Sequence, residues 1–254
     1  MPIYGRFEQN GQIRHAEIEG DTAHFIEDLF GTARRTGESA AIADLKTLAP
    51  VASSKLFAVG LNFADHAAEA NLEVPQWPLM WFKAPSSVIA QGETVEVAHP
   101  DHRTDYEAEL VIVIGKRGKA ISEADAYDYI LGYTNGQDIS DRDVQWGESQ
   151  WARAKSFDTY SPLGPYIYTD VDPNNLTIET YINGEVRQSS NTNQFVFNPA
   201  QLVAFLSESI TLEPGDVIFT GTPFGIAPLK DGDVIETRIG DMVPLINPTR
   251  FKTS

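Results

Sequence analysis

The chain has 254 residues, of which 42% are hydrophobic, so it can bury a substantial core in one large domain or in a medium domain with a small appendage. A formal net charge of −17 argues against binding to nucleic acid or to an anionic membrane, and the lack of cysteine excludes disulfides, thiolate metal sites and a thiol nucleophile. Because the N-terminal residues do not resemble a signal peptide and no apolar run could span a membrane, we expect a cytoplasmic protein.

Residues 1–50 are predicted to form a small structural unit. The turn at Asn10-Gly11 is typical of a hairpin between short strands. Residues 22–29 are predicted to form a short helix. The unit contains no paired acids, no Gly-rich phosphate loop and no convincing nucleophile. Pro50 therefore marks the expected boundary to a main domain of residues 51–254.

The main domain begins with a short buried strand over residues 56–60, followed by a predicted helix with Asn62 or Asp65 as its N-cap. His66 and Glu69 are three residues apart and would share one face of that helix. A carboxylate beside an imidazole orients the ring and raises its basicity, which is the pattern of a general base. An ordinary surface ion pair has the same spacing.

Three basic side chains precede the most acidic strand. Lys83 lies between an apolar pair and a proline turn, so its ammonium either points into a site or is solvated. His99 and His102 could form a metal pair, but they lie in a polar turn, and we expect both to face solvent.

A run of β-branched residues over 110–114 predicts a strand, and Glu107 and Glu109 enter it on one face. Both faces become apolar within two residues, which predicts an interior strand covered on both sides. Two carboxylates placed there would repel each other and lose solvation, so a divalent cation that prefers oxygen ligands is the simplest partner. The alternative is that this end of the sheet is wet and both acids face water.

Further candidates follow this strand. Residues 122–131 are predicted to form a helix capped by Ser122. Asp138 is the best third ligand for the two glutamates. Arg142 and Gln145 are three residues apart and could contact the same anion, and Lys155 is a second plausible cation for the site.

The last third of the chain has clear turn and cap signals. Asn183-Gly184 predicts a hairpin over residues 177–188, and Asn198 is expected to cap a helix whose apolar face joins the core. A buried strand then ends at Gly221-Thr222, where backbone N–H groups and a hydroxyl could approach a ligand.

Taken together, residues 55–247 resemble the fumarylacetoacetate hydrolase family. Each motif is weak alone, but their order along the chain is specific. The motifs are Asn62-Phe63-Ala64-Asp65-His66 with Glu69, Phe82-Lys83, Asp105-Tyr106-Glu107-Ala108-Glu109-Leu110, Gly132-Tyr133 with Asp138 and Arg142-Asp143, Lys155-Ser156-Phe157-Asp158, Asn183-Gly184-Glu185 and Gly221-Thr222-Pro223.

The resemblance implies a mostly β fold with a few helices (α+β), in which a mixed β-sandwich or roll forms the catalytic domain beside a small N-terminal domain. It also implies a homodimer and a bound Mg²⁺ or Mn²⁺. The implied residues are the metal ligands Glu107, Glu109 and Asp138, the catalytic residues His66, Glu69 and Lys155, and the substrate-binding residues Arg142, Gln145, Thr222 and Lys83. The chain departs from the family at Phe63, where tyrosine is frequent, and at residues 224–227, where many relatives have more glycine; both changes would reshape the pocket.

The implied activity is divalent-metal-dependent hydrolysis of a C–C bond in acylpyruvate or fumarylpyruvate 2-oxo acids through a metal-stabilised enolate. The alternative is an isomerase or decarboxylase in aromatic compound breakdown, acting on 2-hydroxyhepta-2,4-diene-1,7-dioate or a similar diacid, or an oxaloacetate decarboxylase. The same site supports all three reactions, and the sequence does not choose among them. A binding scaffold that lost its activity is disfavoured, because it would have no reason to keep the acids, the base and the lysine.

Overall fold

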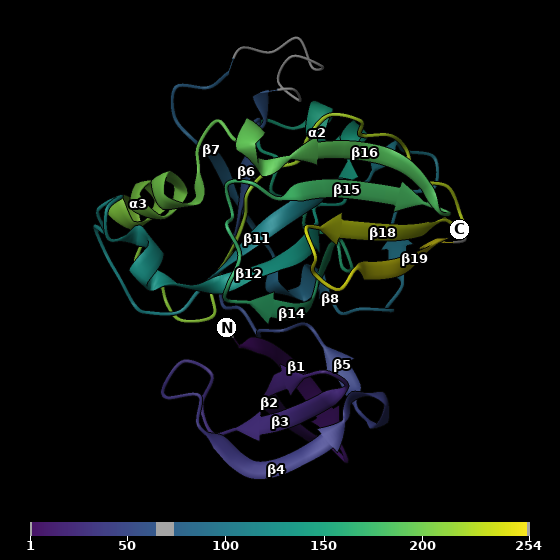
Figure 1. Cartoon of the computed structure of the whole chain (residues 1–254). Helices are drawn as coiled ribbons and strands as arrows, with labels where there is room; N and C mark the ends of the chain where they lie inside the picture. The colour runs from purple at the N-terminus through teal and green to yellow at the C-terminus, as the bar shows by residue number, and fades with distance from the viewer. Residues whose placement is uncertain (1, 65–73, 253–254) are drawn as a thin grey trace.

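The structure is a computed structural model that describes residues 2–64 and 74–252, and strands dominate it (Figure 1). The α-helices of the described chain are α2 (Arg142–Gly147) and α3 (Pro199–Ser209). Short 3₁₀ turns occupy Ile42–Asp44, Pro85–Ser87, Ala126–Tyr129 and Thr192–Gln194. This composition confirms the predicted mostly β, α+β class. Within the described ranges, no helix is both long enough and apolar enough to cross a membrane.

Most strands belong to one 12-stranded sheet. Its main path runs, in spatial order, through β4 (Arg35–Ala41), β3 (Thr22–Ile26), β2 (Gln12–Glu19), β1 (Ile3–Gln9), β14 (Ser161–Tyr168), β12 (Ile130–Gln137), β11 (Ala108–Ile114), β17 (Val217–Phe219), β6 (Leu56–Gly60) and β7 (Leu79–Lys83). Two short strands join beside this path: β5 (Lys46–Leu48) pairs with β1, and β8 (Val88–Ile89) pairs with β14.

Two smaller sheets complete the fold. The five-stranded sheet has the order β16 (Glu185–Asn191), β15 (Thr177–Ile182), β18 (Val234–Ile239), β19 (Leu245–Phe251) and β9 (Val95–Val97). A two-stranded sheet pairs β10 (Thr104–Asp105) with β13 (Ser140–Asp141). This short pairing brings the approach to β11 against the segment that leads into α2.

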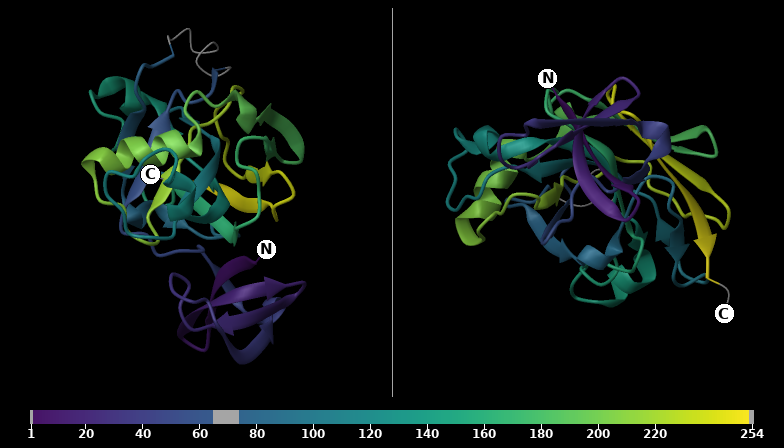
Figure 2. Two further views of the ribbon diagram at one scale, coloured as in Figure 1. Left: turned by 60° about the vertical axis from the view of Figure 1, so that its left-hand side comes forward. Right: turned by 90° about the horizontal axis from the view of Figure 1, so that it is seen from below.

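Strands β1–β5 lie together at one end of the molecule (Figures 1 and 2). The predicted hairpin turn between β1 and β2 is confirmed, and both Asn10 and Gly11 have a positive φ. The predicted helix over residues 22–29 is wrong, because Thr22–Ile26 forms β3. Its side chains alternate between buried and half-buried, and pairing with β2 and β4 satisfies its backbone.

Strand β11 separates the two largest hydrophobic clusters. Its Val111 and Val113 pack in one cluster with Leu163 and Phe219. Its other face, which includes Leu110, packs in the cluster that contains the apolar side of α3. This arrangement confirms an interior strand covered on both faces, and it leaves the N-terminal end of β11 as the place where buried polar groups gather.

Elsewhere in the described residues, the local signals are confirmed with one exception, and the helix predicted after residue 60 lies largely outside the described residues. Helix α3 has the predicted cap at Asn198, with a complete capping box, and β15 and β16 form the predicted hairpin. The helix predicted over residues 122–131 is wrong, because only one 3₁₀ turn forms and β12 begins at Ile130. The Tyr-Ile-Leu sequence there favours a strand, and β11 offers it a partner.

Candidate active site

Three buried carboxylates meet at the N-terminal end of β11. Glu109 lies in β11, Glu107 immediately precedes it, and Asp138 follows β12, with its backbone N donating to Glu107 O at 2.9 Å. Ligand oxygens of the three lie within 4.8 Å of one another. The residues are 4%, 2% and 0% exposed for Glu107, Glu109 and Asp138. The alternative that the glutamates face water is therefore wrong.

Two buried lysines neutralise part of this charge. Lys155 Nζ donates to Glu107 Oε2 and Asp138 Oδ2, both at 2.7 Å, and to Ser140 Oγ at 2.8 Å. Lys83 Nζ pairs with Asp138 Oδ1 and donates to Tyr160 O at 3.0 Å. Lys83 thus points into the site, and the prediction that it could be solvated is wrong.

Arg142 is the third buried cation and joins two acids. Its Nε donates to Asp105 Oδ2 at 2.8 Å, its Nη2 pairs with Glu107, and its Nη1 donates to Gln145 Oε1 at 2.7 Å. The first turn of α2 therefore presents Arg142 and Gln145 together at the acids. The two side chains that were expected to share an anion bond to each other here.

Glu109 differs from the other acids. Its Oε2 accepts a hydrogen bond from Gly221 N at 2.8 Å, and it forms no ion pair with another described residue. Burial, followed by the charges of Asp138 and Glu107, raises the pKa of Glu109 well above its usual range. Among the residues that the structure describes, Glu109 is therefore the carboxylate of the cluster without an ion-pair partner.

The pKa values of the three buried cations shift in different directions. Burial lowers the pKa of Lys83, and this effect outweighs the attraction of Asp138. Burial also opposes the charge of Lys155, but Asp138 and Glu107 raise its pKa above the usual value. For Arg142, the attraction of Glu107 and Asp105 likewise outweighs burial and raises the pKa. Lys155 and Arg142 are therefore held as cations.

A pocket of about 590 Å³ opens onto this cluster. Its lining includes Glu107, Glu109, Arg142, Gln145, Lys155 and Thr222 from the predicted site, and tryptophans at positions 81, 146 and 151. Thr222 Oγ1 accepts from Gln188 Nε2 at 2.9 Å. The pocket thus brings together six of the predicted residues, whereas Asp138 and Lys83 pair with each other outside its lining.

Arg103 also lines the pocket, and the sequence did not single it out. Its side chain is 43% exposed, and it donates to Asp105 through Nε at 2.9 Å and Nη2 at 3.0 Å. Its place two residues before Asp105 was a weak signal. The pairing of β10 with β13 places Arg103 at the pocket, and no local sequence pattern predicts this pairing.

The remaining predicted residues divide into three groups. His66 and Glu69 lie outside the described residues, so their roles stay predictions. Phe63 is fully buried against Phe195 and does not line the pocket, whereas Ile226 does, so the second departure from the family reaches the site. The expectation that His99 and His102 simply face solvent is wrong, because both are half-buried and contact Asp141.

The acid cluster fits a hard divalent cation. All its donors are oxygens, which suits Mg²⁺ or Mn²⁺ better than ions that prefer nitrogen or sulfur. Among the described residues, Glu109 bonds to a backbone N–H and to no cation, and this geometry favours a bound cation over a purely lysine-neutralised cluster. The donor set does not select between the two ions.

Sequence profiles of two families match the chain. The profile described as fumarylacetoacetate (FAA) hydrolase, C-terminal, matches residues 55–250, and the profile described as Rv2993c-like, N-terminal, matches residues 4–50. The first match contains every described residue of the candidate site.

Similar proteins include one named as uncharacterized from Archaeoglobus fulgidus, 45% identical over 98% of this chain and 96% of its own. Oxaloacetate tautomerase fahd2 of Xenopus laevis, named as mitochondrial, is 41% identical over 81% of this chain and 68% of its own. The crystal structure of 2-hydroxyhepta-2,4-diene-1,7-dioate isomerase from Mycobacterium marinum superimposes with a TM-score of 0.93, at 37% identity, and covers the whole of both chains.

Proposed function

Because the chain belongs to the fumarylacetoacetate hydrolase family, we propose that it is a divalent-metal-dependent enzyme that interconverts the keto and enol forms of a short 2-oxo diacid. The observation that carries the proposal is the set of three buried carboxylates, one of them without an ion-pair partner among the described residues. Two of the three, Glu107 and Glu109, line a pocket together with Arg142 and Lys155. The names of the tautomerase and isomerase relatives support proton transfer as the reaction.

Glu107, Glu109 and Asp138 would hold the ion, which supplies Lewis-acid stabilisation of negative charge on the substrate's keto and carboxylate oxygens. Lys155 and Arg142 are buried cations fixed by several bonds each, so they can stabilise charge that develops on the keto oxygen without moving far. Thr222 and Gln145 line the same pocket and can orient a carboxylate. Each group is held before the substrate arrives.

Arg103 suggests why the substrate is a diacid. Among the described cations of the pocket it is the exposed one, since Arg142 and Lys155 are almost fully buried. A guanidinium at the pocket wall can pair with a second carboxylate at the far end of a short substrate. Tryptophans at positions 81, 146 and 151 add apolar surface to the same pocket, which suits the carbon chain between the two carboxylates.

The proton acceptor is the part of the proposal that rests on the sequence alone. His66, oriented by Glu69, is the predicted base, and in a tautomerase it would remove a proton from the carbon beside the keto group. The hydrolysis of acylpyruvates predicted from the sequence needs the same base to activate water. Both reactions begin with the same bound 2-oxo acid.

Proton exchange tests the proposal. The protein is incubated in D₂O with Mg²⁺ and oxaloacetate, and deuterium at the carbon beside the keto group is followed by mass spectrometry, against Mg²⁺ without protein. We expect faster exchange with the protein, and no acceleration when EDTA is present. Exchange at the protein-free rate would contradict a tautomerase. Release of pyruvate from an acylpyruvate would instead identify the hydrolase, and release of CO₂ from oxaloacetate the decarboxylase.

A further inference from the structure

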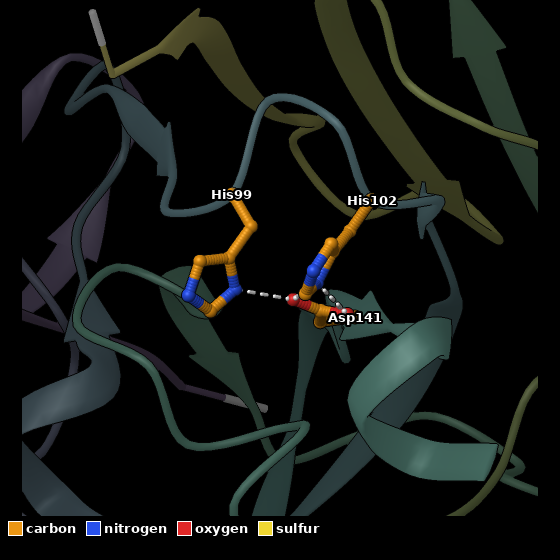
Figure 3. Close-up of side chains that lie close together, drawn as sticks. All are labelled: His99, His102 and Asp141. Carbon is orange, nitrogen blue, oxygen red and sulfur yellow. Dashed lines mark hydrogen bonds and ion pairs between the residues drawn. The ribbon is translucent and has the colours of Figure 1, made fainter. Parts of the chain in front are cut away.

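A second cluster of metal-binding side chains lies on the turn that leads into β10. His99 and His102 come from this turn, and both point at Asp141 of β13 (Figure 3). None of the three lines the active-site pocket. The cluster has therefore no assigned part in the proposed reaction.

The two imidazoles converge on one carboxylate oxygen. His99 Nδ1 lies 2.8 Å and His102 Nδ1 2.9 Å from Asp141 Oδ2, and His102 Nδ1 is also 3.0 Å from Oδ1. Two ligands that bind one Zn²⁺ ion at about 2.0–2.1 Å in tetrahedral geometry lie about 3.3–3.4 Å apart, which is about 0.5 Å more than the distances here. A shift of this size would place one cation between the carboxylate and both rings.

Surrounding contacts hold the three side chains in place. Asp141 Oδ1 accepts from Val144 N at 3.1 Å, which fixes the carboxylate. The His99 ring packs edge-on against Phe157, with centroids 5.2 Å apart, and the two imidazole centroids are 4.4 Å apart. Such outer contacts are what orient metal ligands in known sites.

The charge of Asp141 and the exposure of the two imidazoles to solvent also suit a cation. The Asp141 side chain is fully buried, and although burial opposes its ionisation, hydrogen bonds with His99, Val144 and His102 keep its pKa below the usual value. The imidazoles are 41% and 34% exposed, so an ion can enter from solvent between them. Two arginines are near: Arg153 is exposed and paired with Glu148, and Arg103, which follows His102 in the chain, is paired with Asp105.

We propose that His99, His102 and Asp141 form a second cation site, selective for a divalent transition metal of the Zn²⁺ class. Two imidazole nitrogens and one carboxylate are ligands that Zn²⁺ prefers, whereas Mg²⁺ prefers the oxygen-only cluster of the active site. An ion bound here ties the turn of residues 99–102 to the start of α2, which carries Arg142. The site thus fixes a segment next to the catalytic pocket without belonging to it.

Calorimetric titration of the full chain with ZnCl₂, in excess Mg²⁺, tests the site. We expect one Zn²⁺ ion per chain in the wild type and at least a tenfold loss of affinity in H99A and in H102A, with no remaining site in the double variant. The control H24A removes a half-buried histidine beside Glu19 and should keep the wild-type affinity. The control E109Q weakens the oxygen-only cluster and should keep it too.

Two results would overturn the site: no Zn²⁺ binding by the wild type, or wild-type affinity in the double variant. Circular dichroism of the metal-free variants checks that they fold. If the double variant does not fold, X-ray absorption at the zinc edge of the wild-type protein decides the matter. Two imidazole ligands support the proposal, and an oxygen-only shell refutes it.

Discussion

Glu109 is the acid whose charge the described residues leave uncompensated, so its replacement separates metal binding from folding. We expect E109Q to bind Mg²⁺ at least roughly tenfold more weakly and to lose activity. Because the amide cannot ionise and so is not repelled by Asp138 and Glu107, the metal-free variant should unfold at the same temperature as the wild type or higher. Calorimetry and thermal unfolding measure the two effects. The exposed control E208Q should change neither, and unchanged Mg²⁺ affinity in E109Q would contradict the assignment.

Arg142 compensates two buried acids at once, so removing it leaves charge without a partner. R142M should lower the free energy of unfolding by about 3–5 kcal/mol, the usual effect of breaking a buried ion pair. Urea unfolding measures the change. The matched control R187M removes an exposed pair with Glu185 and should cost less than about 1 kcal/mol. Equal losses in the two variants would show that the Arg142 network does not stabilise the protein.

Arg103 tests the substrate class. R103M should raise the KM for oxaloacetate about tenfold, which corresponds to about 1.4 kcal/mol of binding, with a smaller change in kcat. Asp105 keeps its bond from Arg142 in this variant, so the fold should persist. Steady-state kinetics measure KM and kcat separately. R153M, which removes an exposed arginine outside the pocket lining, is the control. An unchanged KM in R103M would reject a diacid held at this residue.

At the scale of elements, the connection after β17 shows how backbone geometry supports the site. Gly221 has a φ of +95° and donates its N–H to Glu109, and an added Cβ would lie 2.8 Å from Asn62 Cβ. Gly184 has a φ of +82° but no atom within 4 Å of such a Cβ. Both positions therefore have a positive φ that favours glycine, and only at Gly221 would an added Cβ also clash with a neighbour.

The pair makes a matched test. G184A should destabilise the protein by about 1–2 kcal/mol through backbone strain alone. G221A should lose about 1–3 kcal/mol more because of the clash, and it should weaken Mg²⁺ binding because the backbone shift displaces the N–H that anchors Glu109. Thermal unfolding and calorimetry measure both. If the variants behave alike, Gly221 has no special part in positioning Glu109.

Elements with strong local signals were predictable, and elements decided by tertiary pairing were not. The β-branched run of β11 and the cap at Asn198 identified their elements directly. Residues 22–29 and 122–131 also had helix signals, but neighbouring strands offered pairing that a single short helix could not match. Side chains alternate between the two faces of a strand, and this predicted that Glu107 and Glu109 lie together at β11. The position of Arg103 depended instead on the non-local pairing of β10 with β13.

At the scale of the whole molecule, the family profile confirms the resemblance to the fumarylacetoacetate hydrolase family. The order of several motifs along the chain could predict it because that order reflects many non-local contacts at once. The chain is strongly acidic, with a net charge of −17, and it concentrates several acids in one buried site. A cation that binds there should stabilise the native state by mass action. At a Mg²⁺ concentration one hundred times Kd, the gain is about 2.7 kcal/mol.

Thermal unfolding over a range of Mg²⁺ concentrations measures this gain. The midpoint should rise with the logarithm of the Mg²⁺ concentration above Kd, and EDTA should reverse the rise. K⁺ at equal ionic strength controls for screening of the acidic surface. A rise of the same size with K⁺ would assign the stabilisation to screening and not to the acid cluster.

We infer above all that Glu107, Glu109 and Asp138 hold one divalent ion together. Crystals grown with Mn²⁺ test it most directly through anomalous diffraction at the manganese edge. We expect one strong peak about 2.0–2.3 Å from an oxygen of each of the three carboxylates. The absence of a peak there at saturating Mn²⁺, with the three acids still bonded to Lys83, Lys155 and Arg142, would contradict it.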